Sequence, residues 1–225
     1  MDNSTNPPLS LLQRLKQQAD EKKNSADQKQ GLQEQQRRVI SAAMSAAYSY
    51  LRELVEQVNV LNPPSPAYYL NEQLQFSDLA WTEGRADLRR IESTTDDHLI
   101  KTVSLRYALA GVKPLVIEKD ALGIPPMKQI LDDYGLQFEI KETKNAKART
   151  ETGCFTIKCE VRAGLLFTAD YDVGDIHLRT VNVQRFGNAE YRIPAETLTR
   201  DVVEEIALLV LGESNQFVRR FKRIS

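Results

Sequence analysis

The densest group of side chains that could hold a metal or move protons lies between Asp170 and His177. Asp170, Asp172, Asp175 and His177 stand within eight residues, and hard cations favour clustered carboxylates. The calcium-loop pattern needs a third ligand position and a later bidentate glutamate, and this stretch supplies neither. Because tight turns also recruit aspartate and glycine, we expect a solvated hairpin turn here. A metal or catalytic site is the alternative.

A second pattern, Glu139-x-Lys141, matches half of a metal-dependent nuclease motif. The acidic residue would hold Mg²⁺ and the lysine would steady the attacking water in phosphodiester hydrolysis, with Asp120 or Asp133 as the upstream acid. The same two residues equally form the solvent face of a strand over 136–140 whose alternate residues are apolar. We favour the strand.

Basic residues gather in two places. One is the loop 141–149, and the other lies near the end of the sequence, where four candidate anion contacts fall within five residues: Arg219, Arg220, Lys222 and Arg223. Both groups could contact phosphates. Cations are also favoured in the last turn of a helix by its dipole, and the chain as a whole carries a net charge of only -1. Nucleic acid is therefore a partner that we do not favour.

Motifs of the common enzyme classes are absent from the sequence. It has no phosphate-binding loop, dinucleotide-binding glycine motif, serine nucleophile elbow, H-E-x-x-H or paired-cysteine motif. Cys154 and Cys159 are five residues apart in a strand-like stretch, so they point to opposite faces and cannot bridge within it. His98 has no evident nucleophile beside it. We expect no catalytic residue, cofactor or bound metal, and we lean towards a protein that is not an enzyme.

A long helix is predicted for the N-terminal quarter of the chain. From Leu9 to Asn62 there is no proline and one glycine, Gly31, whereas prolines follow at 63, 64 and 66. In its second half, apolar residues alternate in spacings of four and three, which is typical of a heptad seam. The seam consists of Ile40, Met44, Ala47, Leu51, Leu54, Val58 and Leu61. We expect it to pair with a second chain as a coiled-coil dimer, and packing on the chain's own sheet is the alternative.

The same register becomes polar towards the N-terminus, where it holds Lys23, Gln30, Gln33 and Arg37. The segment 24–27 also offers an internal cap or break. We therefore expect residues 1–38 to be a flexible or partly helical arm. Residues 39–225 should form a single α+β domain, with 39–62 as its self-association or packing helix.

Beyond residue 66 the apolar period changes from that of a helix to that of a strand. Alternating runs at 155–161 and 165–171 predict strands joined by a hairpin at 163–164, with further turns at 172–175 and 186–188 and a bulge near 179–180. Other strands are expected at 74–76, 99–109, 115–117 and 136–140, and Trp81 is expected in the core or at a sheet edge. A short helix over 125–134 interrupts them.

A second long helical pattern begins after Thr199 and continues across Gly212, as one helix or as two collinear ones. The fold class expected is thus α+β. It comprises a long N-terminal helix, a curved antiparallel sheet meander interrupted by a short helix, and a long C-terminal helix packed on the sheet.

Composition narrows the function without identifying it. Of the 225 residues 41% are apolar and 27% charged, and the longest apolar run, Ile206 to Leu211, is far shorter than the ~20 residues of a membrane helix. We expect a cytoplasmic protein without a membrane partner. The favoured function is a non-enzymatic interaction, scaffold or regulatory protein that forms a homodimer or docks a protein through its N-terminal helix. The alternative is a nucleic-acid- or nucleotide-binding protein, of which a metal-dependent nuclease is one form. A protein that binds a small molecule in a pocket of the sheet is a third alternative.

Overall fold

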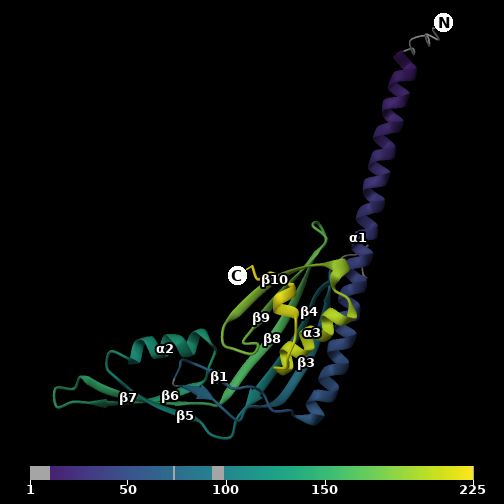
Figure 1. The fold of residues 1–225 in the computed structure, drawn as a ribbon. Helices are drawn as coiled ribbons and strands as arrows, with labels where there is room; N and C mark the ends of the chain where they lie inside the picture. The colour runs from purple at the N-terminus through teal and green to yellow at the C-terminus, as the bar shows by residue number, and fades with distance from the viewer. Residues whose placement is uncertain (1–10, 73, 93–98, 225) are drawn as a thin grey trace.

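The computed structural model describes residues 11–72, 74–92 and 99–224 (Figure 1). Its helices are α1 (Leu11–Leu61), α2 (Ile124–Asp133), α3 (Arg200–Leu211) and α4 (Phe217–Arg220), with a 3-10 turn η1 (Ala195–Thr197). Its strands are β1 (Tyr68–Tyr69), β2 (Gln75–Phe76), β3 (Ala80–Arg90), β4 (Ile100–Ala110), β5 (Leu115–Asp120), β6 (Phe138–Lys144), β7 (Thr150–Ile157), β8 (Glu160–Asp170), β9 (Asp175–Val181) and β10 (Asn188–Pro194). The predicted α+β class is confirmed.

Helix α1 runs through 51 residues without interruption, a length of roughly 76 Å at 1.5 Å per residue. The break predicted at 24–27 is wrong. The Ser25 hydroxyl donates to the carbonyl of Lys22 (2.9 Å), so it bonds within the helix and does not cap a new one. Serine and asparagine are common at caps, but their side chains can also turn back onto the preceding helical turn.

Five strands form the main sheet, in the order β10-β9-β8-β4-β3 and antiparallel throughout. One face of this sheet joins the apolar sides of α1 and α3 in a single core. The side chains of the other face alternate with the core residues along each strand, and they are polar or charged at most positions. The sheet is therefore covered on one face only, as is common in antiparallel sheets.

Two features predicted in this sheet are wrong. Residues 163–164 are not a hairpin turn: Gly164 lies inside β8, paired with Arg106 and Val181, and a β-carbon there would come within 2.7 Å of the Leu105 carbonyl oxygen. The glycine thus reflects close strand packing. The bulge predicted near 179–180 is also absent, because β9 keeps an unbroken register with both neighbours and Thr180 fills a buried position. The turns at 172–175 and 186–188 are confirmed.

A smaller sheet, β5-β7-β6, extends from one end of the main sheet and carries α2 on one face (Figure 1). Helix α2 packs so closely that a β-carbon at Gly153 of β7 would meet Ile124 at 2.8 Å. Strands β7 and β8, predicted as neighbours in one meander, belong to different sheets and meet at residues 158–159.

Asn182 links the end of α2 to the main sheet. Its amide nitrogen donates to the carbonyls of Tyr134, at the end of α2, and of Arg162 on β8 (3.1 and 3.0 Å). Its side-chain oxygen accepts from the Gly187 N–H (2.9 Å), and its carbonyl accepts from the Tyr68 hydroxyl (2.9 Å). Its backbone has a φ of 50°, which asparagine tolerates better than most residues.

The C-terminal helical pattern is divided in two. Gly212 ends α3 with a φ of 76°, and α4 begins only at Phe217. Thr199 lies at the N-cap of α3, as predicted, but its side chain makes no capping hydrogen bond. Within the described part of the chain, none of the helices has the length and apolar content needed to cross a membrane.

Candidate functional site

The heptad seam lies against the chain's own domain. Ile40, Met44, Ala47 and Leu51 are 0% exposed and Val58 is buried within this one chain. Leu54 is half-buried against the same core. Leu61, at the end of the helix, is 73% exposed, so its predicted place in a buried seam is wrong.

The seam packs on strands β3 and β4 and on helix α3. At its C-terminal end, the Trp81 indole N–H donates to the side-chain oxygen of Asn59 (2.7 Å), whose amide donates to the Gly84 carbonyl (3.0 Å). Trp81 is 2% exposed and stacks on Tyr107 at 4.6 Å, which confirms its predicted place in the core. Because the domain already covers the seam, a coiled-coil dimer through these residues is not supported.

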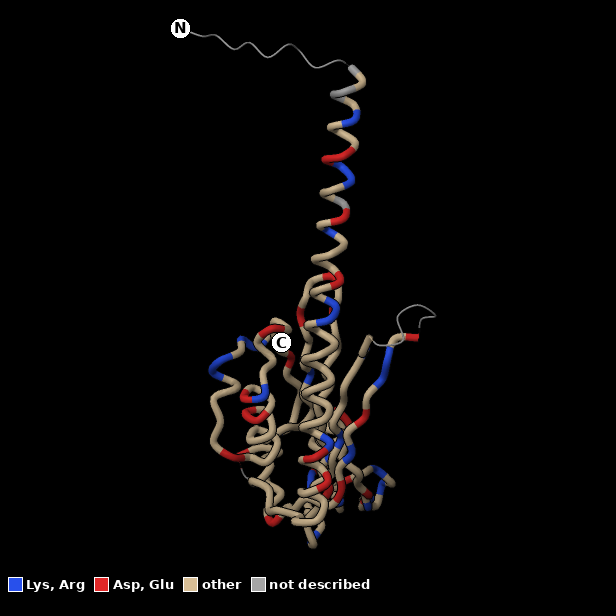
Figure 2. Tube along the Cα trace, turned by 90° about the vertical axis from the view of Figure 1, so that its right-hand side faces the viewer, with Lys and Arg blue, Asp and Glu red and all other residues tan. Residues whose placement is uncertain are grey.

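The N-terminal half of α1 projects away from the domain (Figure 2). Contact with the domain begins at Gln36, whose side chain packs against Gly174 in the β8–β9 turn. Every described side chain from Leu12 to Gln35 is exposed, including Leu12, Leu15 and Leu32 at 63, 53 and 67%. We call residues 11–35 the projecting segment. It is about 38 Å long at 1.5 Å per residue.

Residues of the nuclease pattern are not brought together. Glu139 and Lys141 lie on edge strand β6, and Asp120 lies on the opposite edge strand, β5. Through β7, Glu139 is level with Thr156 and Asp120 with Thr152, so the two carboxylates are separated by four residues, ~13 Å along the strands, as well as two strand spacings. A single metal ion cannot bridge that separation.

The acidic cluster forms a turn, as predicted. The Asp170 carboxylate accepts from the backbone N–H groups of Asp172 and Val173 (3.2 and 3.1 Å), and it lies 3.7 Å from His177. Asp175 is paired with Arg192 at 3.3 Å. The part of the chain that the structure describes contains no group of three or more residues arranged to hold a metal. His98 lies outside the described residues.

Neither cysteine is in a disulfide. Burial raises the pKa of the Cys159 thiol, which makes the thiolate less available at neutral pH.

The four C-terminal cations are divided between α4 and the segment after it. Arg220 lies over the Phe221 ring at 5.6 Å, and Arg223 donates to the Asn188 carbonyl (2.7 Å). The predicted loop 141–149 is shorter than expected, because residues 141–144 belong to β6 and only 145–149 form the hairpin to β7. That hairpin lies at the far end of the small sheet from the C-terminus (Figure 1). The two basic groups therefore do not form one surface.

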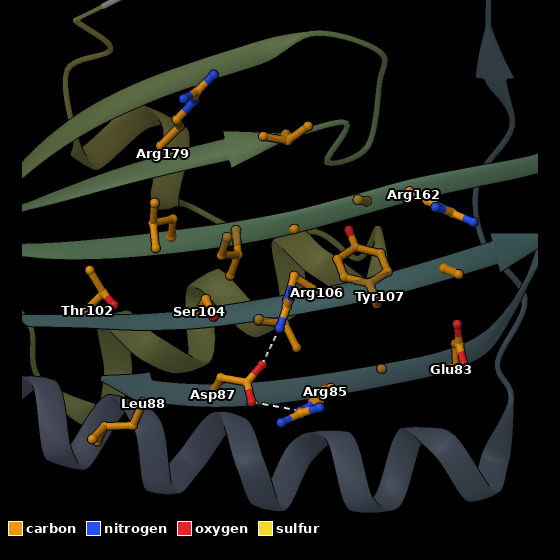
Figure 3. A pocket seen from close by; sticks show the side chains of 18 of the residues that line it. Glu83, Arg85, Asp87, Leu88, Thr102, Ser104, Arg106, Tyr107, Arg162 and Arg179 are labelled. Atoms are coloured by element: carbon orange, nitrogen blue, oxygen red, sulfur yellow. Dashed lines mark hydrogen bonds and ion pairs between the residues drawn. The ribbon is translucent and has the colours of Figure 1, made fainter. Parts of the chain in front are cut away.

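A surface that the sequence did not indicate lies on the uncovered face of the main sheet (Figure 3). It is a broad, shallow hollow of about 1230 Å³, lined by residues of β3, β4, β8 and β9. On β3, at one side of this hollow, Asp87 accepts from Nε of Arg85 (2.7 Å) and from Nη2 of Arg106 (2.6 Å). The hydrogen bond from Arg106, assisted by the charge of Arg85, holds the pKa of the Asp87 carboxyl below its usual value.

Arginine is the main charged residue of this hollow. Its described lining holds five arginines, two carboxylates and no lysine; the arginines are Arg85, Arg89, Arg106, Arg162 and Arg179. Arg162 is paired with Glu160 (3.1 Å) and Arg179 with Glu190 (4.0 Å) at the rim. We call this surface the arginine face. Its residues lie far apart in the sequence, and only the pairing of four strands brings them together.

Comparison with protein families, with curated proteins and with solved structures finds no match to this chain. The protein's class is therefore given by its own architecture. It is an α+β protein with one half-covered antiparallel sheet, a helix that projects from it, and two surfaces that contribute little to its core.

Proposed function

We propose that this chain is a non-enzymatic interaction protein that self-associates or docks a partner protein through the projecting segment of α1. The observation that carries this proposal is a helical segment about 38 Å long whose described side chains are all exposed. Most of the stability of a protein helix comes from packing one of its faces against other structure, and the described side chains of this segment have no such packing. A surface that covers one side of the segment would supply the missing stabilisation.

The composition of the projecting segment supports a protein as that covering surface. Leu12, Leu15 and Ala19 are spaced by three and four residues, so they share one side of the helix. Lysines and acidic residues both follow along the segment (Figure 2). Mixed charge around a short apolar stripe is typical of helices that pair with other helices.

The other half of α1 would give the projecting segment a fixed direction. Residues from Ile40 to Val58 are anchored in the domain core, and the helix continues from the core into the projecting segment without a break. A partner bound there would be held at a set orientation relative to the sheet, which suits a scaffold.

Sedimentation of the full chain tests self-association. At about 50 µM we expect a multiple of the 25.5 kDa chain mass. Leu12→Glu combined with Leu15→Glu should shift the chain to the monomer. The matched control, Gln18→Glu with Gln28→Glu, adds the same two charges to the same segment without removing apolar surface, and it should keep most of the assembly.

A monomeric wild type would overturn self-association. Limited proteolysis then tests whether the projecting segment is uncovered and thus able to bind a different protein. Trypsin should cut first between about residues 20 and 38 and leave a folded fragment, because an uncovered helix opens readily. A monomer whose projecting segment resists protease would need no partner at all, and both forms of the proposal would fail.

The nucleic-acid alternative, carried by the C-terminal cations and the 141–149 loop, gains no support from their placement. The two groups lie on different parts of the molecule, and Arg223 is already bonded to Asn188.

A further inference from the structure

The arginine face is not explained by the fold or by the proposed function. Its guanidinium groups contribute little to stability, since the side chains of Arg85, Arg106 and Arg162 are 77, 69 and 70% exposed. Their carboxylate partners Asp87 and Glu160 are 22 and 17% exposed, so the pairs lie at the surface, where ion pairs are worth only about 0–1 kcal/mol. Phosphate groups can therefore compete with these carboxylates for the arginines. We propose that the arginine face binds the sugar–phosphate backbone of single-stranded nucleic acid.

Charge is the first argument for this ligand. The described lining holds five arginines and two carboxylates, and with the rim residues Glu160, Glu190 and Lys158 the excess is two positive charges, although the whole chain has a net charge of -1. Arginine presents a planar fork of donors that matches phosphate oxygens, whereas lysine acts as a point charge. Each of the two guanidinium groups on Asp87 gives one N–H to that carboxylate, which leaves the other donors available.

Shape is the second argument. Arg85 and Arg179 lie three strands apart, ~14 Å, and the registers of Arg89 and Arg162 differ by six residues, ~20 Å along the strands. A small phosphorylated ligand would touch only one or two of these arginines and would lie largely in solvent, unlike the usual ligand in its pocket. An extended polyanion can reach several of them at once.

The uncharged residues of the face argue against an acidic protein segment. Protein interfaces draw their binding energy from buried aromatic and large apolar anchors. Such anchors are most often Trp, Tyr or Arg and seldom Leu or Val. The exposed large apolar side chains of the described lining are Leu166 and Val181, whereas its aromatic residue, Tyr107, is only 4% exposed. Without an exposed ring on which bases could stack, we expect little preference for base sequence and a strong dependence on salt.

Fluorescence anisotropy of the full chain with a labelled oligo-uridine of about twenty nucleotides tests the proposal. If about four phosphates are neutralised, the association constant should fall roughly 50-fold between about 50 and about 200 mM salt. Arg106→Gln, Arg162→Gln and Arg179→Gln combined should lower affinity at least about tenfold and flatten the salt dependence. The matched control, Arg219→Gln with Arg220→Gln and Lys222→Gln, removes the same charge elsewhere and should stay within about twofold.

Each contrary outcome overturns the proposal. These outcomes are no binding by the wild type at low salt, an equal loss in the two triple variants, or a loss only in the C-terminal one. Poly-glutamate that competes as well as oligo-uridine would assign the face to an acidic protein segment, and equal binding to anionic vesicles would assign it to lipid headgroups. If the triple variant lowers the thermal midpoint, Arg162→Gln and Arg179→Gln tested singly should each still weaken binding about two- to fourfold.

The variant with Leu12→Glu and Leu15→Glu separates this inference from the proposed function. Both substitutions lie in the projecting segment, away from the arginine face. They should leave the affinity for oligo-uridine unchanged.

Discussion

Replacing Leu51 by alanine should destabilise the whole domain, because this side chain is 0% exposed at the centre of the seam. The substitution removes three carbon atoms from the core, which costs about 2.4 kcal/mol at about 0.8 kcal/mol for each buried carbon. The cavity left behind adds to this loss, and buried leucine-to-alanine changes cost 2–5 kcal/mol in general. We expect a loss of about 3 kcal/mol, which for a chain of this size lowers the midpoint of thermal unfolding by roughly 6–12 °C.

Leu61→Ala is the matched control, because it removes the same atoms from the same helix at a position that is 73% exposed. It should change the free energy of unfolding by no more than about 0.5 kcal/mol. Both variants and the wild type are to be unfolded by heat and by urea, at about 1 and about 50 µM chain.

Concentration dependence decides whether the seam packs within one chain. If it does, the loss in Leu51→Ala should be the same at both concentrations, without any change in sedimenting mass. A loss that appears mainly at low concentration together with a halved mass would place Leu51 between two chains. Equal losses in Leu51→Ala and Leu61→Ala would contradict the burial from which the magnitude was worked out.

Further substitutions test individual contacts, each by urea unfolding unless stated. Gly212→Ala should cost more than about 1 kcal/mol, because the position has a φ of 76° and a β-carbon there would collide with Pro66. Gly31→Ala, where a β-carbon meets nothing within 4 Å, should instead raise helicity by circular dichroism and gain about 0.5–1 kcal/mol of helix stability; an unchanged signal would contradict a helical projecting segment. Asn182→Ala should cost roughly 2–4 kcal/mol, since the carbonyls of Tyr134 and Arg162 and the N–H of Gly187 lose their partner. Burial raises the pKa of Tyr68 to about 12 and also raises the pKa of Tyr107, so both neutral phenols are favoured in the folded state and stability should fall as the pH rises above about 10; Tyr68→Phe should make that fall less steep by roughly 1.4 kcal/mol per pH unit up to pH 12.

The elements of this fold were largely predictable because their signals are local. The proline-free stretch before residue 63 marked α1, and Gly135 with Pro125 and Pro126 bounded α2 within a residue or two. Which strands would pair was not predictable in the same way. Ala163-Gly164 has the composition of a turn, but Gly164 is glycine because the Leu105 carbonyl lies close to it, and that contact joins residues far apart in the sequence.

The candidate surfaces also differ in whether local sequence signals could reveal them. The heptad seam was found from spacing, but spacing alone does not say whether a second chain or the chain's own sheet covers it. The arginine face was missed because Arg85, Arg106, Arg162 and Arg179 carry no common motif, and they meet only through strand pairing. The alternation of Arg106, Arg162 and Arg179 with buried neighbours along their strands was a local sign of a charged strand face.

The outer strand edges of the main sheet and of the small sheet differ in whether further backbone covers them. In the main sheet, residues 63–65 pair with the start of β3, and Ile224 donates to the Glu190 carbonyl (2.7 Å) on the outer side of β10. In the small sheet, β5 and β6 each have a single strand neighbour, β7. Their outer edges therefore offer backbone donors and acceptors to any extended chain.

The uncovered edge strands β5 and β6 carry charged side chains, which disfavour the pairing of one exposed edge with another. Strand β5 ends in Glu118, Lys119 and Asp120, and β6 alternates acidic residues with lysines from Glu139 onward. Charges along an exposed edge oppose the stacking of identical strands. The Glu139-x-Lys141 pattern, which suggests a nuclease when met in the sequence, thus has a structural explanation: it places two exposed charges on edge strand β6.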